Sequence, residues 1–266
     1  MLHLKSLTLR ALPENGSFPF SLPILRGLEE LRFEADVTFF VGENGSGKST
    51  LMEGIACAAE MVTVGSENIR TDKSLGHARE LAKYLKLAWT KRTKRGFFLR
   101  AEDFFGYAKR QNEMRAEMES DLRDIDAEYK NRSEYAKALA KMGTAGQLHD
   151  MRRRYGDGLD ARSHGESFLA LFQSRFVPDG LYLLDEPEAP LSPIRQLGLI
   201  AAIKQMTAQN GQFIIATHSP IVMAYPGAQI LSFEDGKIRL AEYDSLEHVS
   251  LTRDFLQNPR AYIERL

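Results

Sequence analysis

The pattern of apolar and polar residues along this chain predicts a mixed α/β fold. Residues 2–9 alternate between the two kinds, which is typical of a half-buried strand. Short, mostly apolar runs fit strands that are buried on both faces of a parallel sheet. They occupy residues 37–41, 181–184, 213–216 and 230–233, with helical patterns at 51–56, 168–172 and 194–208. This alternation predicts a mostly parallel core sheet that is covered by helices.

The segment before the first buried strand predicts a small antiparallel β-subdomain. Residues 13–16, Pro-Glu-Asn-Gly, are a strong turn signal, and residues 18–25 are predicted to form a second strand after residues 2–9. An aromatic side chain here, Phe18 or Phe20, is a candidate to stack on adenine. A position in the core is the more ordinary role for either ring.

The middle of the chain is basic and then strongly helical. Residues 85–89 and 96–99 are predicted to pair as a hairpin around the basic turn Lys91–Arg95. The span from residue 70 to 115 holds thirteen Lys or Arg and five Asp or Glu, a net charge of about +8. It is either a patch for nucleic acid or, as we favour, a solvated turn balanced by acidic surface elsewhere.

Residues 102–142 are highly charged and nearly free of glycine, which predicts one long helix or a helical pair that projects from the core. Residues 143–159 are expected to be rich in loops. Near the end of the chain, Asp244 or Ser245 is expected to cap a helix, and Pro259 to open another. We therefore expect a single domain over residues 1–266. Its parts would be residues 1–64, an inserted basic and helical lobe at 65–160, and residues 161–266.

Composition narrows the function classes. The 266 residues carry a net charge of −1, which argues against bulk electrostatic binding of polyanions. One cysteine, Cys57, permits no internal disulfide and is expected to be a small buried residue. No signal peptide and no apolar run of about 18 residues is visible. We expect a cytoplasmic protein that does not insert into a membrane by itself.

The clearest chemical motif follows the strand at residues 37–41. Residues 42–49 read G-x-x-x-x-G-K-S and lead into a helix, which is the context of a phosphate-binding loop. Glycines allow positive φ angles, so successive backbone N–H groups can face the phosphates of ATP. Lys48 would reach the β- and γ-phosphates, and the Ser49 hydroxyl would bind Mg²⁺. The predicted nucleotide-binding residues are Gly42, Glu43, Asn44, Gly45, Ser46, Gly47, Lys48, Ser49 and Thr50.

Two other buried strands end in residues suited to hydrolysis. Asp185 ends the strand at 181–184 and is placed to hold Mg²⁺ through water. Glu186 follows it and is placed to polarise the attacking water as general base. His218 follows the strand at 213–216, where a neutral imidazole can donate to a γ-phosphate. Taken singly, each could be an ordinary turn residue; their combination with Lys48 predicts an ATPase site.

A third motif precedes the helix at residues 168–172. Residues 163–166 read S-x-x-E, which is an ordinary capping box. The same geometry makes a helix N-terminus with free N–H groups, so Ser163, Gly165 and Glu166 are also candidates to bind a γ-phosphate.

In their order and spacing, residues 42–49, 163–166, 185–187 and 218 resemble the heads of ABC-type ATPases. The resemblance implies Walker A, signature, Walker B and His-switch elements. It also implies a head-to-tail dimer with two ATP molecules in the interface. Lys48, Ser49 and Thr50 would then act in cis, and Ser163 and Gly165 in trans.

Departures from the transporter pattern refine this resemblance. His164 and Glu166 replace a glycine and a glutamine of the signature, and residues 217–220, Thr-His-Ser-Pro, resemble the SMC, RecF-type and stand-alone bacterial ATPase branch. The expected metal-binding glutamine of that family is missing after residues 96–99. Glu102 is our candidate to replace it near Mg²⁺, and a helix-capping acid is an equal alternative.

These motifs together predict a Mg²⁺-dependent ATPase that forms a homodimer on ATP binding and switches an unidentified protein partner. A DNA-associated module of the SMC or RecF kind, acting in repair or phage defence, is one alternative, and the nucleotide-binding subunit of a transporter is another. A guanine-specificity motif of the Asn-Lys-x-Asp type is missing, which disfavours a GTPase.

Overall fold

The computed structural model describes the chain except for residues 1, 14–15, 65–68, 70–71, 156–163 and 265–266. Its centre is a six-stranded sheet in the order β5-β6-β7-β3-β8-β9. These strands are β3 (Val37–Val41), β5 (Gly96–Arg100), β6 (Leu181–Asp185), β7 (Gln212–Ala216), β8 (Gln229–Glu234) and β9 (Lys237–Leu240). All pairs are parallel except β8 with β9. The prediction of a mostly parallel sheet in an α/β fold is confirmed.

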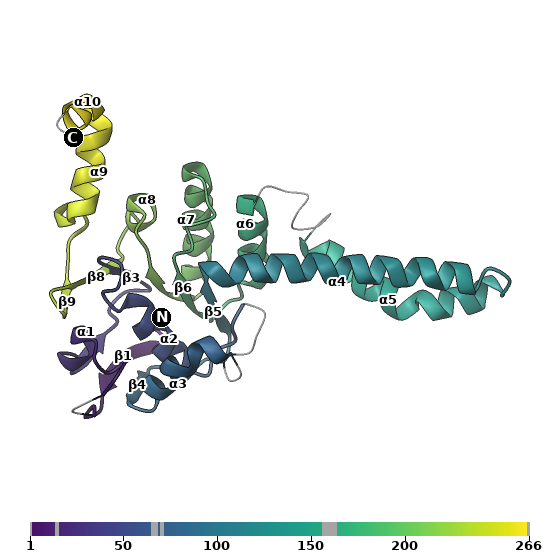
Figure 1. Ribbon diagram of the computed structural model, residues 1–266, viewed down its shortest axis with the longest axis horizontal. Helices are drawn as coiled ribbons and strands as arrows, with labels where there is room; N and C mark the ends of the chain where they lie inside the picture. The colour runs from purple at the N-terminus through teal and green to yellow at the C-terminus, as the bar shows by residue number, and fades with distance from the viewer. Residues whose placement is uncertain (1, 14–15, 65–68, 70–71, 156–163, 265–266) are drawn as a thin grey trace.

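Both faces of the main sheet are covered, which explains why its strands are apolar throughout. Successive residues of β3 point into different cores: Phe39 lies in one and Phe40 in the other, both with no exposed surface. On the Phe39 face lie α6 (His164–Arg175), α7 (Pro193–Thr207) and α8 (Pro220–Met223). On the Phe40 face lie α2 (Lys48–Ala58), α3 (Gly76–Ala82) and a smaller sheet (Figure 1).

The smaller sheet is antiparallel in the order β2-β1-β4, from β1 (Leu4–Leu9), β2 (Glu30–Arg32) and β4 (Leu85–Trp89). A small antiparallel β-subdomain was expected, but its second strand was placed wrongly. Residues 18–25 form turns and the short helix α1 (Pro23–Arg26), because Pro23 suits the first position of a helix and cannot donate to a strand ladder. The buried Gln212 side chain joins the sheets by accepting from the backbone N–H groups of His3 and Leu4, both at 2.8 Å.

The predicted hairpin of residues 85–89 and 96–99 is wrong. Its two strands lie in different sheets: β4 pairs with β1, whereas β5 pairs in parallel with β6. The burial patterns explain the difference. Residues of β4 alternate in exposure, as in a sheet with one solvated face, whereas residues 97–100 of β5 are all buried. The basic segment Lys91–Arg95 therefore crosses between two sheets instead of closing a tight turn.

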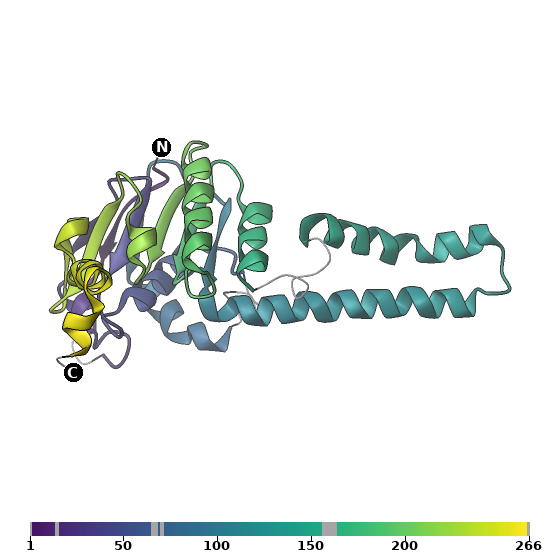
Figure 2. The same ribbon diagram turned by 90° about the horizontal axis from the view of Figure 1, so that it is seen from above.

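A helical hairpin of α4 (Ala101–Glu128) and α5 (Glu134–Tyr155) projects from the edge of the main sheet (Figures 1 and 2). Near its tip, Asp126 accepts hydrogen bonds from Lys137 and Lys141 at 2.6 and 2.5 Å. The prediction of a projecting helical pair is confirmed. The prediction of loops after residue 142 is wrong as far as Tyr155, because α5 continues through Gly143 and Gly146, whose cost in helix propensity is only about 1 kcal/mol each.

The last segments lie at the opposite end of the molecule from the hairpin (Figure 1). They comprise the 3₁₀ turn η2 (Tyr243–Ser245), α9 (Glu247–Gln257) and α10 (Pro259–Ile263). Pro259 opens a helix as predicted. The prediction that Asp244 or Ser245 caps a helix is wrong. Both residues form part of η2, and Leu246 is the residue before α9. A further 3₁₀ turn, η1 (Lys73–Leu75), and α3 follow α2 and were not predicted. Within the described ranges, no helix has the length and apolar character that a membrane crossing requires.

Candidate ATP-binding site at the carboxyl edge of the main sheet

The phosphate-binding loop connects the end of β3 to the start of α2, as its sequence predicts. Gly42 and Gly47 have φ angles of 140° and 98°, a region that side chains rarely adopt. A Cβ atom at Gly42 would lie 2.6 Å from the carbonyl oxygen of Phe233, and one at Gly47 would lie 2.8 Å from Ile24. The glycines are therefore required by the neighbouring β8 and α1 as well as by the backbone of the loop.

Lys48 is held at the centre of this loop. It is 5% exposed, and its ammonium group donates to the carbonyl oxygens of Gly42 and Glu43 at 2.6 and 2.8 Å. Burial lowers the pKa of Lys48, and the nearby charges of Asp185 and Glu186 act against that shift. Lys48 therefore lies against the loop backbone and close enough to Asp185 and Glu186 for their negative charges to act on its pKa.

Asp185 ends β6 and has the features of a metal-binding carboxylate. It is 8% exposed, and the Ser49 side chain donates a hydrogen bond to it. Its Oδ1 atom is buried without a hydrogen-bond partner. Burial, helped by Glu186 and Glu53, raises the pKa of Asp185 to about 6. A buried carboxylate oxygen without a partner, next to a hydroxyl group, fits a hard cation such as Mg²⁺.

The described residues contain no group of three or more His, Cys, Asp or Glu side chains that could hold a metal ion on their own. Mg²⁺ commonly takes only one or two carboxylates from the protein, and it completes its shell with water and the phosphates of a nucleotide. Asp185 with Ser49 is therefore a set of ligands for a metal that arrives with ATP.

Glu186 and His218 face each other at the ends of β6 and β7. Their side chains are 46% and 41% exposed, and Nε2 of His218 lies 3.9 Å from Oε1 of Glu186. Glu186 has a φ angle of 50°, which is rare for a residue with a side chain and is often found at functional sites. Its backbone N–H donates to the carbonyl oxygen of Ala216, so the two strand ends are joined next to this pair.

The loop that carries His218 is fixed by neighbouring side chains. The backbone N–H of His218 donates to Oε1 of Glu188 at 2.8 Å. Ser219 Oγ accepts from the backbone N–H of Val222 in α8. Ser219 Oγ also donates to Gln196 on α7 at 2.5 Å. Motif spacing did not indicate these roles, because the fold brings Glu188, in the turn after β6, and Gln196, on α7, to the loop after β7.

Some predicted site residues cannot be placed at this edge. Ser163 lies outside the described residues. Gly165 and Glu166 lie in the first turn of α6, and Glu102 lies in the first turn of α4, but the side chains of Glu166 and Glu102 are outside what the structure describes. The expected roles of these four residues stay predictions.

The two aromatic candidates for adenine stacking differ. Phe20 packs edge-on against Tyr84, with ring centroids 5.1 Å apart, as a core aromatic does. Phe18 is 53% exposed, and its ring centroid lies 5.0 Å from that of His77. Of the two rings, Phe18 is therefore the one with a surface open to a ligand.

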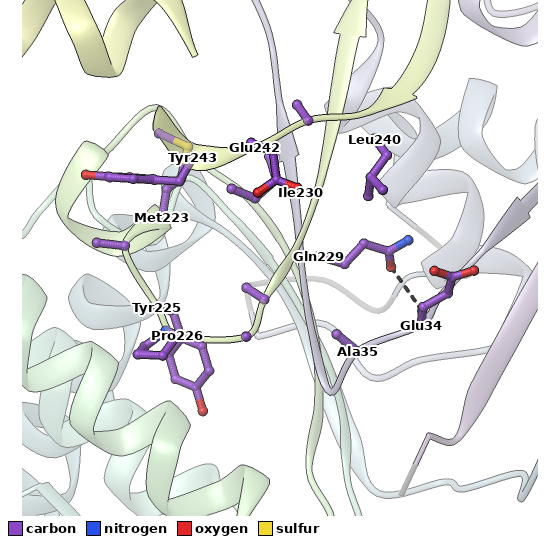
Figure 3. Close-up of a pocket in the computed structure, with 14 residues that line it drawn as sticks. Glu34, Ala35, Met223, Tyr225, Pro226, Gln229, Ile230, Leu240, Glu242 and Tyr243 are labelled. Atoms are coloured by element: carbon purple, nitrogen blue, oxygen red, sulfur yellow. Dashed lines mark hydrogen bonds between the residues drawn. The ribbon is translucent and has the colours of Figure 1, made fainter. Parts of the chain in front are cut away.

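Two surface hollows lie away from the phosphate loop. Figure 3 shows a pocket of about 560 Å³ next to β8 and β9, in which Gln229 already accepts a hydrogen bond from the backbone of Glu34. A second, more apolar hollow of about 840 Å³ lies between α7 and α9, with His218 at its margin. Neither is lined by Lys48 or Asp185.

Comparison with known proteins agrees with the motifs. A family model described as an AAA domain matches residues 16–145. The thiamine import ATP-binding protein ThiQ of Vibrio cholerae is 23% identical over 228 residues, which cover 85% of this chain and 84% of ThiQ. The predicted resemblance to ABC-type P-loop ATPases is confirmed. The AAA-domain match includes the phosphate loop and the first part of the helical hairpin.

Solved structures with similar folds include both SMC heads and transporter ATPases. The Smc head of Pyrococcus furiosus, bound to the C-terminal domain of ScpA, has a TM-score of 0.49 and 13% identity and covers 98% of this chain and 100% of that one. The cbiO1 protein of Clostridium perfringens, part of the ABC transporter complex cbiONQ, also has a TM-score of 0.49, with 16% identity. It covers 100% of this chain and 99% of that one.

Proposed function

We propose that this ABC-type ATPase domain binds ATP with Mg²⁺ and hydrolyses it. The observation that carries the proposal is the meeting of three strand ends at one edge of the sheet. There, Lys48 lies in the phosphate loop, Asp185 has a buried free oxygen beside Ser49, and Glu186 faces His218. This is a set that can hold a nucleotide phosphate, a cation and a water molecule together.

Each side chain has a distinct role in the proposed reaction. Lys48 would exchange its contacts with the loop carbonyl groups for contacts with the β- and γ-phosphates. Asp185 and Ser49 would hold Mg²⁺, which, when bound, neutralises charge on the phosphates. Glu186 would accept a proton from water, and His218 would donate to the γ-phosphate. Both of these last side chains are partly exposed, as a group that meets incoming water must be.

The proposal extends to a dimer that forms on ATP binding. The open position of Glu186 and His218 leaves room for a second chain over the site. Ser163, Gly165 and Glu166 at the start of α6 would supply contacts to the γ-phosphate in trans. Because those contacts need the γ-phosphate, hydrolysis would release the second chain and so switch an attached protein partner. We place this cycle in the cytoplasm.

The most direct test of hydrolysis compares Glu186→Gln with the wild-type chain. The variant is expected to bind ATP with an affinity within about threefold of wild type, since the phosphate contacts are kept, and to lose about a hundredfold or more in phosphate release. His218→Ala should also lose turnover while binding is retained. Phosphate release by Glu186→Gln at the wild-type rate would contradict the role of Glu186 as general base.

A second candidate function, binding of nucleic acid, rests on the crossing between the two sheets. Lys91, Arg92, Lys94 and Arg95 are exposed there. Arg95 is less available to bind phosphates than the other three, because its Nη1 atom lies 3.7 Å from Oδ2 of Asp179. If this segment binds duplex DNA, the affinity should fall steeply between about 50 and 200 mM salt. A Lys91→Ala and Arg92→Ala double variant should lose it, whereas unchanged binding would contradict the candidate.

The similarity to ThiQ supports testing the transporter alternative as well. A nucleotide-binding subunit of that kind would copurify with a membrane protein when Glu186→Gln holds ATP. Capture of a soluble protein in the same experiment would instead support the proposed switching of a protein partner.

A further inference from the structure

A cluster of largely buried charges surrounds Arg100, the last residue of β5. Its side chain is 8% exposed and, among the side chains that the structure describes, contacts the carboxylates of Glu53, Asp72 and Asp103. The guanidinium group lies 2.7 and 2.9 Å from the two oxygens of Asp103, 3.3 Å from Glu53 and 3.1 Å from Asp72. It also donates to Ser74 Oγ at 3.3 Å. Motifs predicted none of these contacts.

The three carboxylates come from three separate elements. Glu53 lies on α2, in the second turn after Lys48. Asp72 begins the η1 turn, where its side chain also accepts from Ser74. Asp103 lies in the first turn of α4, at the base of the projecting hairpin. A single buried side chain therefore holds the phosphate-loop helix, a surface turn and the base of the hairpin together.

The chemistry of arginine suits this position. A guanidinium group is planar, always charged and able to meet a carboxylate with two parallel hydrogen bonds, as it does at Asp103. Burial acts to raise the pKa of Asp72, but hydrogen bonds from Ser74 and the charge of Arg100 outweigh it, so the pKa is lowered. Glu53 uses its second oxygen to bind Nε2 of His77 at 2.7 Å. Arg100, Asp103, Asp72, Glu53 and His77 thus form one connected network of hydrogen bonds and ion pairs.

The cluster lies next to the proposed ATP site. Arg100 pairs directly with Asp185 in the register of β5 and β6. Glu53 belongs to the same helix as Lys48 and Ser49, and its charge contributes to the raised pKa of Asp185. A displacement of α2 would therefore reach Arg100 directly, through its contact with Glu53.

We propose that Arg100 is the joint through which occupancy of the phosphate site is transmitted to the α4–α5 hairpin. The proposal rests on the proposed function, since it needs ATP to bind at Lys48. In this view Arg100 is a positioning residue: it keeps Asp103 and the base of α4 in register with Glu53 on α2. Movement of α2 on ATP binding then changes the first turns of the hairpin through the contacts of Arg100 with Glu53 and Asp103.

The test uses hydrogen exchange of the full chain with the Glu186→Gln substitution, with and without Mg²⁺-ATP. Residues 42–50 report nucleotide binding, and residues 101–108 report the base of the hairpin. The chain that carries only Glu186→Gln is the parent. In this parent, ATP is expected to slow hydrogen exchange at both segments, by about fivefold or more at residues 101–108. Adding Asp103→Asn should reduce the second effect to below about twofold while protection of residues 42–50 is retained.

Two further variants separate a joint from simple stabilisation. Asp103→Glu keeps the charge, so it should restore most of the ATP effect at residues 101–108. Asp121→Asn makes the same chemical change at an exposed position of α4 and should leave the effect intact. In the background with Glu186 intact, Asp103→Asn should leave the KM for ATP within about twofold of wild type, because no contact with the nucleotide is lost.

Three outcomes would overturn the joint. The first is a full ATP effect at residues 101–108 in the Asp103→Asn variant. The second is protection of residues 42–50 without any change at residues 101–108 in the parent. The third is an equal loss of the ATP effect at residues 101–108 in the Asp121→Asn variant. That result would show that removing any acidic side chain from α4 has the same consequence. A lack of ATP protection at residues 42–50 in the parent would instead overturn the proposed function, and the joint with it.

Discussion

The edge of the main sheet and the helical hairpin are opposite kinds of structure. At the sheet, Phe39 and Phe40 have no exposed surface, and the strand ends are joined by hydrogen bonds to their neighbours. On the hairpin, Tyr135 and Leu139 are 79% and 57% exposed, and ion pairs such as Asp126 with Lys137 and Lys141 lie at its surface. The first region holds its side chains by burial and hydrogen bonds, whereas the second exposes large apolar side chains and projects from the sheet (Figure 1).

Because of this difference, substitutions in the two regions should have different effects on ATP binding and on stability. Changes at the sheet edge should remove binding or stability, and changes along the hairpin should leave both nearly intact. Among the described residues, the hairpin contacts the rest of the molecule near its base, where Arg100 binds Asp103, where Leu148 of α5 is buried and where α5 meets α6. The following predictions test that contrast.

The largest effect is expected for Lys48→Ala. The variant loses the cation that the proposed site sets against the β- and γ-phosphates, so ATP affinity should fall by about a hundredfold or more. Titration calorimetry measures this directly. Lys83→Ala removes an exposed lysine that pairs with Glu80 and should bind ATP normally. Comparable ATP binding by the two variants would contradict the site.

A matched pair of truncations tests stability in the two regions. Phe39→Ala opens a cavity in the core between the sheet and α7 and should lower the free energy of unfolding by about 3–5 kcal/mol. Leu139→Ala removes an exposed side chain from α5 and should change that free energy by no more than about 0.5 kcal/mol. Denaturant unfolding gives both values. A large loss in Leu139→Ala would show that the hairpin has packing partners.

Asp185→Asn should stabilise the metal-free protein while removing its response to Mg²⁺. The pKa of Asp185 is raised to about 6, so between about pH 4 and pH 6 the unfolded chain ionises first and the folded state loses stability as the pH rises. A shift of about two units corresponds to roughly 2–3 kcal/mol. The asparagine variant should recover about that amount at pH 7 without metal, and nothing below pH 4.

Denaturant unfolding at pH 4 and pH 7 in the presence of a chelator measures this effect, and Asp121→Asn is the exposed control. In the wild-type chain, the affinity for Mg²⁺ should also weaken below about pH 6, because metal binding must then displace a proton from Asp185. An identical pH dependence of stability in Asp185→Asn and wild type would show that Asp185 is not a buried, uncompensated charge.

The smallest effect is expected from shortening the hairpin. Replacing residues 114–142 by a short Gly-Ser linker keeps the base of α4, Leu148 and the Arg100 cluster. ATP affinity should stay within about twofold of wild type, because no described contact of the site lies in the deleted part. Loss of ATP binding in a folded variant would contradict the separation of the two regions.

The sequence predicted the sheet edge well for a physical reason. A phosphate loop, a strand that ends in Asp185 and Glu186, and a strand followed by His218 are local patterns, and parallel strands bring their carboxyl ends to one edge. The partner of each strand was predicted less well. Residues 85–89 and 96–99 are close in sequence but belong to different sheets, and only the exposure of alternate residues distinguishes them.

The Arg100 cluster illustrates what local patterns cannot show. Glu53 and Asp103 are 50 positions apart, and each sits in a helix where an exposed acid would be ordinary. Only the fold brings them to one guanidinium group. The helix over residues 143–155 was missed for a different reason: its glycines lower helix propensity, but in open space nothing else interrupts the hydrogen bonds.

In the proposed cycle, ATP at this sheet edge joins two copies of the chain. Light scattering coupled to sizing chromatography of the Glu186→Gln variant measures this association. With Mg²⁺-ATP, the expected mass is twice the 30.0 kDa of one chain, and it returns to 30.0 kDa with ADP or when Lys48→Ala is added. A mass of 30.0 kDa in saturating Mg²⁺-ATP, with ATP demonstrably bound, would contradict it.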